Sequence, residues 1–380
     1  MSMRVLLTGG GSGGHVNPAI AIADTIKMNL PDAEIAFVGV KNGKESDLVP
    51  RAGYPLYYVE SQGFSRSLSL SNLKAMATAL TSPRSKQTTD VLKSFRPDIV
   101  IGTGGYVCWP LLRAATLAGI PTMVHESNCK PGLAVKMLQF SVDTILLNFS
   151  ETREQLQCRK KCVVVGNPLR AGFGSIPKEQ ARAKLSMQEE ERLVLCYAGS
   201  LGSETVNAAV LDMLRTLAPT RPNTRFVLAT GMKNYDSAHS LCSQYELDRC
   251  DNVIVKDYIY DMPLIMSAAD VVISRAGAMS LSELAKMGKA SVVIPSPNVA
   301  DGHQLCNARA LADRGAALLV EETDFPCGAL SRAVLNLLDN RDVRRQLEKN
   351  IRAVANQDAN RLIYECITKA VQEYQTRNHQ

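Results

Sequence analysis

The chain has 380 residues, more than one hydrophobic core usually holds, so two domains are expected. Its hydrophobic content of 46% is that of an ordinary globular protein. No apolar run approaches the roughly twenty residues that cross a bilayer. The net charge is +6, but no segment combines basic and aromatic residues as nucleic-acid-binding surfaces do. A nucleic-acid partner is therefore not expected.

The ten cysteines are scattered and form no C-x-x-C pair, which favours reduced thiols in a cytoplasmic protein. Cys158 and Cys162 weakly suggest a metal site, but further ligands are lacking beside them. The apolar run that follows Arg4 leads directly into a glycine cluster. It is therefore predicted to be a strand and not a secretory signal.

The start of the chain predicts a strand, a tight turn and a helix. An apolar run at 3–8 is followed by GGGSGG at 9–14, then by His15 and an amphipathic stretch at 16–26. Glycines let a ligand approach the main chain, and a helix start offers free N–H groups and a positive dipole end. The pattern predicts a phosphate site.

The same glycines match the dinucleotide fingerprint G-x-G-x-x-G, which requires an acid at the end of the next strand. That strand is predicted at 35–38, and the nearest acid, Glu34, lies at its start. A nicotinamide or flavin cofactor is therefore not expected. His15 indicates chemistry better, because a histidine at a helix start can exchange a proton beside a phosphate. The alternative is a histidine that only caps the helix.

The segment Phe64–Arg96 carries a basic rim around an apolar helical stripe. Leu73, Met76, Ala77 and Leu80 follow helical spacing among six basic residues and one acid, Asp90. Such a helix can rest on an anionic membrane surface. The alternative is that it buries the stripe in the domain core.

Further strands and turns continue the pattern through the first half. A strand at 97–101 runs into the turn 102–106, and a strand at 120–124 ends in His125-Glu126-Ser127-Asn128. Polar residues at the ends of parallel strands are where open α/β sheets place ligands. Strands at 144–147 and 162–165 lead to glycine and proline at 166–168, where the domain linker is predicted.

The second half repeats this organisation. Strands are predicted at 193–198, 225–230, 253–255, 271–274 and 291–295, with anion-type turns at 199–203 and 277–280. Glu283, about one helical turn into the following helix, can accept hydrogen bonds from a ribose, although a carboxylate there also stabilises the helix dipole. No metal-type cluster stands near these turns, so main chain and dipole, with no cofactor, are expected to offset a diphosphate.

Alternating strands and helices predict an α/β protein with two doubly wound, Rossmann-like domains that face each other across a cleft. The expected divisions are a first domain at 1–167, a second domain at 168–356, and a terminal helix at 357–380 that returns to the first domain.

Six motifs stand out along the chain: GGSGGHVNP at 10–18, GGYV at 104–107, HESN at 125–128, VGNPLR at 165–170, GAMSLSE at 277–283 and HQ at 303–304. Their order resembles the bacterial peptidoglycan N-acetylglucosaminyltransferases, the MurG family, over nearly the whole chain. The resemblance implies the glycosyltransferase B fold. It also implies an inverting transfer of N-acetylglucosamine from its uridine diphosphate donor to the muramyl 4-hydroxyl of a lipid-linked muramyl-peptide acceptor, at the cytoplasmic face of the membrane.

Carried over from the family, the residues expected to bind the donor sugar nucleotide are Ser12, Gly13, Gly14, Asn128, Arg170, Ser200, Ile259, Ala278, Met279, Ser280, Leu281, Ser282, Glu283 and Gln304. Glu283 would hold the ribose. The N-terminal glycine turns would hold the lipid diphosphate, with Gly104, Gly105 and Tyr106 as acceptor residues. His15 is the first candidate for the catalytic base and Glu126 the second. Two alternatives stay open: a related glycosyltransferase acting on diacylglycerol, and a nucleotide-sugar-binding regulator without turnover.

Overall fold

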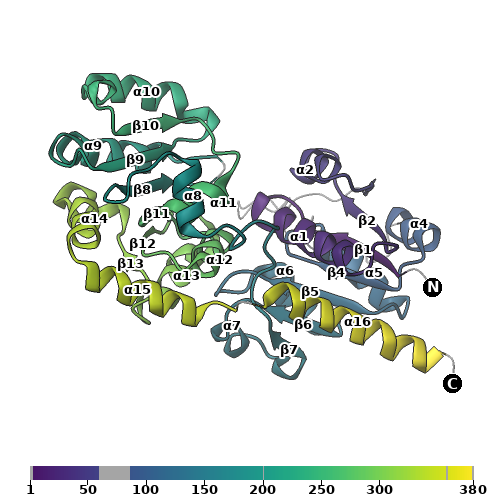
Figure 1. The fold of residues 1–380 in the computed structure, drawn as a ribbon. Coiled ribbons are helices and arrows are strands. Elements are labelled where there is room, and N and C mark those ends of the chain that lie inside the picture. The colour runs from purple at the N-terminus through teal and green to yellow at the C-terminus, as the bar shows by residue number, and fades with distance from the viewer. Residues whose placement is uncertain (1–2, 60–85, 200, 357, 379–380) are drawn as a thin grey trace. The chain divides into compact units, whose positions relative to one another are not determined.

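A computed structural model describes residues 3–59, 86–199, 201–356 and 358–378 (Figure 1). The chain divides into two compact units: unit 1 contains Met1–Arg170 and Asp358–Gln380, and unit 2 contains Ala171–Gln357. Each unit is built on one parallel sheet with helices between successive strands. This is the arrangement predicted from the alternation of apolar runs and amphipathic stretches, and the predicted α/β, Rossmann-like fold class is confirmed.

The sheet of unit 1 has seven strands, all parallel to their neighbours. In spatial order they are β3 (Leu56–Tyr58), β2 (Glu34–Gly39), β1 (Arg4–Thr8), β4 (Ile99–Gly102), β5 (Thr122–Glu126), β6 (Thr144–Leu147) and β7 (Cys162–Val164). The central strands are buried on both faces, which is why they read as continuous apolar runs. Because all run in one direction, their carboxyl ends lie along one edge.

Alternate side chains of β1 enter two different cores. Val5 and Leu7 pack with α1 (Gly13–Asn29) and α16 (Ala359–Asn378), whereas Leu6 packs with three other helices. Those three helices are α4 (Lys86–Phe95), α5 (Cys108–Leu117) and α6 (Leu133–Leu138). The unit also contains α2 (Glu45–Arg51) and α7 (Glu151–Glu154).

Helix α16 joins unit 1 after the chain has completed unit 2. Its Ile363, Ile367 and Val371 lie in the same core as the apolar face of α1. Asn360 donates to the Thr25 hydroxyl at 2.9 Å, and it exchanges two hydrogen bonds with the main chain of Leu169. These bonds hold Leu169 to unit 1. The unit ends after Arg170, three residues beyond the predicted position 167.

The sheet of unit 2 has six parallel strands. In spatial order they are β10 (Val253–Lys256), β9 (Thr224–Ala229), β8 (Arg192–Tyr197), β11 (Val271–Arg275), β12 (Ser291–Ile294) and β13 (Leu318–Leu319). One face packs on a core shared with α9 (Glu204–Thr220), α10 (Tyr235–Gln244), α14 (Ala329–Asp339) and α15 (Arg341–Val354). The remaining helices are α8 (Lys178–Lys184), α11 (Met262–Ala268), α12 (Ala278–Met287) and α13 (His303–Ala312).

The apolar stripe predicted to meet a membrane, Leu73 to Leu80, lies outside the described residues. The described end of that segment forms α4, whose Val91, Leu92 and Phe95 are buried in the core of unit 1. Helix α4 is thus core-facing, whereas both alternatives for the stripe Leu73 to Leu80 stay predictions. Within the described ranges, no helix combines the length and apolar character needed to span a bilayer.

Candidate functional site

The polar turns predicted in the first half leave neighbouring strands of one sheet. The turn 9–14 follows β1, the turn 102–106 follows β4, and Glu126 ends β5, and these three strands are adjacent. Since the strands are parallel, all three groups lie at the carboxyl edge of the sheet. The structure therefore brings the unit 1 candidates to one edge.

The two glycine turns of unit 1 fit into each other. The Gly10 N–H donates to the Gly104 carbonyl at 3.3 Å. Gly104 and Gly105 have φ angles of +103° and +86°, and a Cβ atom on Gly105 would lie 2.1 Å from the Gly10 oxygen. Only glycine allows both the backbone angle and the close approach. The turns therefore form one rigid element.

His15 lies in the first turn of α1 with its imidazole against these glycines. Its Nδ1 atom is 3.1 Å from the Gly10 carbonyl oxygen and 3.2 Å from the Ser12 hydroxyl. Because a carbonyl cannot donate, the bond to Gly10 assigns the proton to Nδ1 and leaves the Nε2 lone pair unprotonated. Burial lowers the pKa of His15, although the Gly10 bond and the Glu45 charge oppose this. The imidazole is therefore neutral at neutral pH.

Glu45, at the start of α2, lies beneath the first glycine turn and was missed in the sequence. Its side chain accepts hydrogen bonds from the N–H groups of Val40 at 3.1 Å and Gly11 at 3.2 Å. An acid at a helix start normally signals only dipole stabilisation, so no sequence pattern separated it from the others. Its position beside Gly11 comes from folding, 34 residues along the chain.

These contacts reduce the number of N–H groups that the predicted phosphate site could use. The N–H groups of Gly10 and Gly11 are already used by Gly104 and by the Glu45 carboxylate. The first N–H groups of α1, on Gly13 and Gly14, precede its first hydrogen bonds and keep the geometry of an anion site. An anion at this turn would therefore bind at the helix start.

Tyr106 completes the turn after β4. Its ring lies beside the first glycine turn, where a Cβ atom on Gly11 would be 3.0 Å from Cε1. Burial and the Glu45 charge both raise the pKa of the phenol, so it stays protonated at neutral pH and can donate a hydrogen bond.

Glu126 holds a loop. One carboxylate oxygen accepts from the Asn128 main chain at 2.9 Å and its amide at 3.1 Å, and the other accepts from Gly132 N–H at 2.8 Å. Both carboxylate oxygens are therefore occupied by hydrogen bonds that hold this loop. The geometry favours His15 over Glu126 as the proton acceptor. The hydrogen bond to Glu126 also fixes the side chain of Asn128. Arg170, another candidate for the donor site, is the last residue of unit 1 and is exposed.

The unit 2 candidates gather at the carboxyl edge of the second sheet. The turn before α9 follows β8, α12 follows β11, and Gln304 lies on α13 after β12, again three adjacent strands. Ser200 lies outside the described residues. Gln304 accepts a hydrogen bond from Ser296 N–H at 2.9 Å, and Ile259, after β10, is buried.

Helix α12 has one buried side and one accessible side. Ala278 and Leu281 pack into the core, while four residues of the first two turns are half-exposed: Met279, Ser280, Ser282 and Glu283. Gly277, the N-cap, has no side chain that could block the helix start. Burial, with the charge of nearby Glu283, strongly raises the pKa of the Tyr197 phenol at the end of β8. Gly277, directly before the helix, and Glu283, in its second turn, are both half-exposed.

Arg275 joins the loops of this edge and was not identified as functional in the sequence. It is 9% exposed and donates to the Ser203 hydroxyl at 2.7 Å and to the Pro295 carbonyl at 3.3 Å. It also forms an ion pair with Glu322. Arg275 therefore connects the turns that follow β8, β11 and β12.

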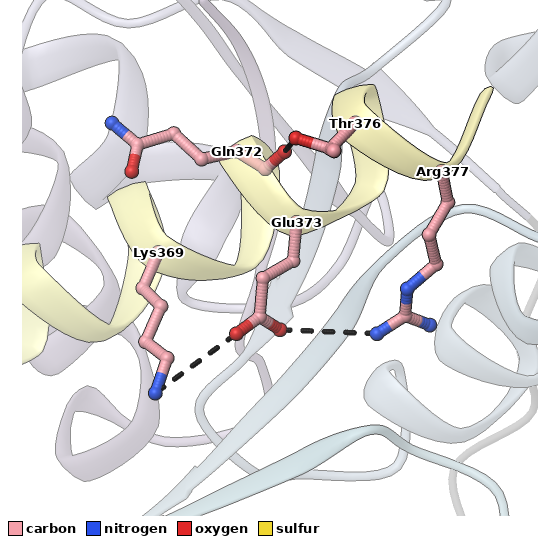
Figure 2. A pocket seen from close by; sticks show the side chains of 5 residues that line it. All are labelled: Lys369, Gln372, Glu373, Thr376 and Arg377. Atoms are coloured by element: carbon pink, nitrogen blue, oxygen red, sulfur yellow. Dashed lines mark hydrogen bonds and ion pairs between the residues drawn. The ribbon is translucent and has the colours of Figure 1, made fainter. Parts of the chain in front are cut away.

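Two other features, a pocket on α16 and the pair Cys158 and Cys162, do not form candidate binding sites. Figure 2 shows a surface pocket lined by one side of α16, where Glu373 lies between Lys369 at 3.9 Å and Arg377 at 3.8 Å. These are ordinary i,i+4 pairs on an exposed helix face. Among the described residues no three His, Cys, Asp or Glu side chains are grouped to hold a metal, and the weak suggestion at Cys158 and Cys162 gains no further ligand.

Comparison with known proteins agrees with this arrangement. Residues 5–147 match the glycosyltransferase family 28 N-terminal domain, and residues 193–363 match the family 28 C-terminal domain. The crystal structure of Acinetobacter baumannii MurG superposes with a TM-score of 0.74 at 26% identity, covering 97% of this chain and 99% of that one. A UDP-GlcNAc 2-epimerase from Neisseria meningitidis, at 17% identity and a TM-score of 0.66, shares the fold over 97% of this chain and all of its own.

Curated relatives are similar over almost their full length. Proteins named UDP-N-acetylglucosamine--N-acetylmuramyl-(pentapeptide) pyrophosphoryl-undecaprenol N-acetylglucosamine transferase are 38% identical in Thermoanaerobacter sp. (strain X514) and in Ruminiclostridium cellulolyticum. The alignments cover 96% and 97% of this chain and 99% and 100% of the relatives. The chain therefore belongs to this N-acetylglucosamine transferase family, the MurG family of glycosyltransferases.

Proposed function

We propose that this protein transfers N-acetylglucosamine from UDP-N-acetylglucosamine to the muramyl 4-hydroxyl of an undecaprenyl-diphosphate-linked muramyl-pentapeptide, the conversion of lipid I to lipid II in peptidoglycan synthesis. The observation that carries the proposal is the nearly full-length 38% identity to transferases named for these two substrates. The half-exposed face of α12 and the glycine element beside His15 are consistent with it.

The proposed reaction is a single displacement. The acceptor hydroxyl oxygen attacks the anomeric carbon, the bond from that carbon to the diphosphate oxygen breaks, and UDP leaves with inversion at the carbon. His15 Nε2 takes the hydroxyl proton, because Nδ1 already carries one and the ring is neutral before reaction. The start of α12 offers N–H groups and a positive dipole to the diphosphate charge that develops on UDP.

We assign the donor to Ser200, Ile259, Gln304 and the stretch Ala278–Glu283, with Glu283 accepting hydrogen bonds from the ribose. We assign the acceptor diphosphate to the start of α1 and to the turn Gly104–Tyr106. In this assignment Tyr106 acts as a neutral donor toward a phosphate oxygen.

Radiolabelled UDP-N-acetylglucosamine, offered with a lipid I analogue or with diacylglycerol, tests the function. Transfer to the analogue is the expected result. Transfer to diacylglycerol alone would identify the related lipid glycosyltransferase instead, and donor binding without any transfer would identify a regulator.

The His15→Ala variant tests the base. We expect kcat to fall by roughly 10²- to 10⁴-fold, the usual contribution of a positioned base, with the donor Kd unchanged. The control is His239→Ala, since His239 is exposed on α10 and its ring lies beside that of Tyr235. Near-normal turnover in His15→Ala would end its candidacy.

We infer further that the protein works as a peripheral protein at the cytoplasmic face of the membrane, because the proposed acceptor is anchored in lipid. The basic and apolar sequence of Phe64–Arg96 supports this inference. Co-sedimentation with vesicles containing anionic lipid, compared with neutral vesicles, tests it. Replacing Lys74 and Arg84 by glutamate should weaken sedimentation without changing donor affinity, and unchanged sedimentation would contradict the assigned segment.

A further inference from the structure

Glu45 is a buried carboxylate to which the reaction above gives no role. It is 1% exposed. Three glycines enclose its side chain: a Cβ atom on Gly43 would lie 2.2 Å from Oε1, on Gly10 2.7 Å from Oε1, and on Gly39 2.4 Å from Cγ. The space around the carboxylate therefore exists only because these positions lack side chains.

The contacts of Glu45 and His15 meet on one peptide group. Glu45 Oε2 accepts the N–H of Gly11, and the Gly10 carbonyl, the other end of the same peptide unit, accepts the His15 Nδ1–H. The order is therefore carboxylate, peptide, imidazole. Hydrogen bonds in such a chain polarise one another, and a negative charge at the N–H end makes the carbonyl a stronger acceptor.

We propose that Glu45 is a positioning residue for His15, acting through the Gly10–Gly11 peptide group. Its charge strengthens the hold of the Gly10 carbonyl on Nδ1–H, keeps Nε2 as the free base, and stabilises the imidazolium formed when Nε2 takes a proton. In a serine protease triad a carboxylate does this by direct contact with the imidazole; here one peptide group lies between them. The proposal rests on the role proposed above for His15.

Among the described residues, three further side chains near His15 or Glu45 are uncharged at neutral pH. Ser12 offers a hydroxyl, the phenol of Tyr106 has a raised pKa, and burial raises the pKa of the Cys108 thiol, at the start of α5, to about 12. The charge that acts on the imidazole is that of Glu45.

The Glu45→Gln variant removes the charge and keeps the shape of the side chain. We expect kcat to fall about tenfold, with the donor Kd unchanged. Losing a nearby negative charge lowers the pKa of an imidazolium, so the acid limb of kcat/KM should move to lower pH by up to about one unit. The ¹⁵N shifts of His15, assigned by comparison with His15→Ala, should show a smaller fraction of the Nδ1–H tautomer.

Two further variants make the test specific. Gly43→Ala places a methyl group 2.2 Å from Oε1 and should displace the carboxylate with its charge retained, moving the His15 ¹⁵N shifts in the same direction. Asp47→Asn is the matched control, since Asp47 is an exposed carboxylate of the same helix, paired with Arg51. It should change neither the ¹⁵N shifts nor kcat.

The outcomes separate this proposal from the assignment of the base. A wild-type spectrum dominated by the Nε2–H tautomer overturns the proposal without any variant. Unchanged His15 shifts in Glu45→Gln and Gly43→Ala overturn it as well. If the shifts move as expected while the acid limb stays in place, Glu45 positions His15 as proposed, and the role of His15 as base fails instead.

Discussion

The guanidinium of Arg275 donates a 2.7 Å hydrogen bond to the hydroxyl of Ser203, joining the end of β11 to the N-cap of the helix after β8. The same guanidinium pairs with Glu322, at the start of the 3₁₀ turn Glu322–Cys327. Both partners of this ion pair are largely buried. One side chain therefore couples the turns from which the donor site is proposed to be built.

Replacing Arg275 by methionine should leave Glu322 without its cation in a desolvated position. We expect the free energy of unfolding to fall by about 3 kcal/mol, as when one partner of a buried pair is removed. Urea denaturation followed by circular dichroism measures this. The double variant Arg275→Met/Glu322→Gln should recover part of the loss, because no unpaired charge remains. Equal losses in both variants would contradict the ion-pair explanation.

His125 should make the protein less stable in mild acid. Its side chain is fully buried and its Nε2 donates to the Gly166 carbonyl at 2.9 Å. Burial lowers its pKa from 6.5 to about 4. Between these values the unfolded chain binds a proton that the folded chain does not, so stability is complete above pH 6.5 and falls as the pH drops toward 4. At 1.36 kcal/mol per unit the loss approaches about 3 kcal/mol.

Urea unfolding between pH 7.5 and pH 4.5 measures this dependence. The His125→Gln variant should be less stable at neutral pH but should show a shallower slope, because the titrating group is gone. A slope equal to that of the wild type would assign the acid sensitivity to other groups.

Glu283 should control donor affinity more than turnover. Hydrogen bonds to a charged acceptor contribute roughly 1.5–3 kcal/mol, so Glu283→Ala should raise the Kd for UDP by about ten- to a hundredfold. Isothermal titration calorimetry measures this, with the exposed Glu190→Gln as control. If Glu283 only stabilises the dipole of α12, the variant will lower thermal stability and leave the Kd for UDP unchanged.

Asn360 should determine how firmly α16 is held on unit 1. Removing its hydrogen bonds to Leu169 and Thr25 should cost about 2 kcal/mol in Asn360→Ala. Amide hydrogen exchange should then speed up in α1 and α16 and stay unchanged in unit 2. Gln372→Ala, on the exposed side of α16, is the control. Equal protection of α16 in both variants would show that its apolar face alone holds it.

The parallel strands could be predicted because strands that are buried on both faces have short, continuous apolar sequences. The predicted strand at 271–274, for example, differs from β11 by one residue. The strand β3 was not predicted, because it lies at the sheet edge with Tyr57 and Tyr58 exposed and therefore has no continuous apolar run. Local pattern therefore predicted the sheet interiors and failed at an edge.

The candidate residues on glycine turns could be predicted because glycine clusters and strand ends are visible locally. Glu45 and Arg275 could not, since their roles depend on partners 34 and 47 residues away, Gly11 and Glu322, that folding brings to them. Glycines at 39 and 43 around an acid were the available signal for Glu45, and glycines also occur in ordinary turns.

The return of α16 to unit 1 has a consequence for biosynthesis. A ribosome makes the seven-stranded sheet first, yet the apolar side chains that close its core beside α1 emerge only after all of unit 2 has been translated. The second unit can thus mature while the first still exposes hydrophobic surface. Nascent chains halted before Ala359 should therefore be more sensitive to protease in the half that was synthesised earlier.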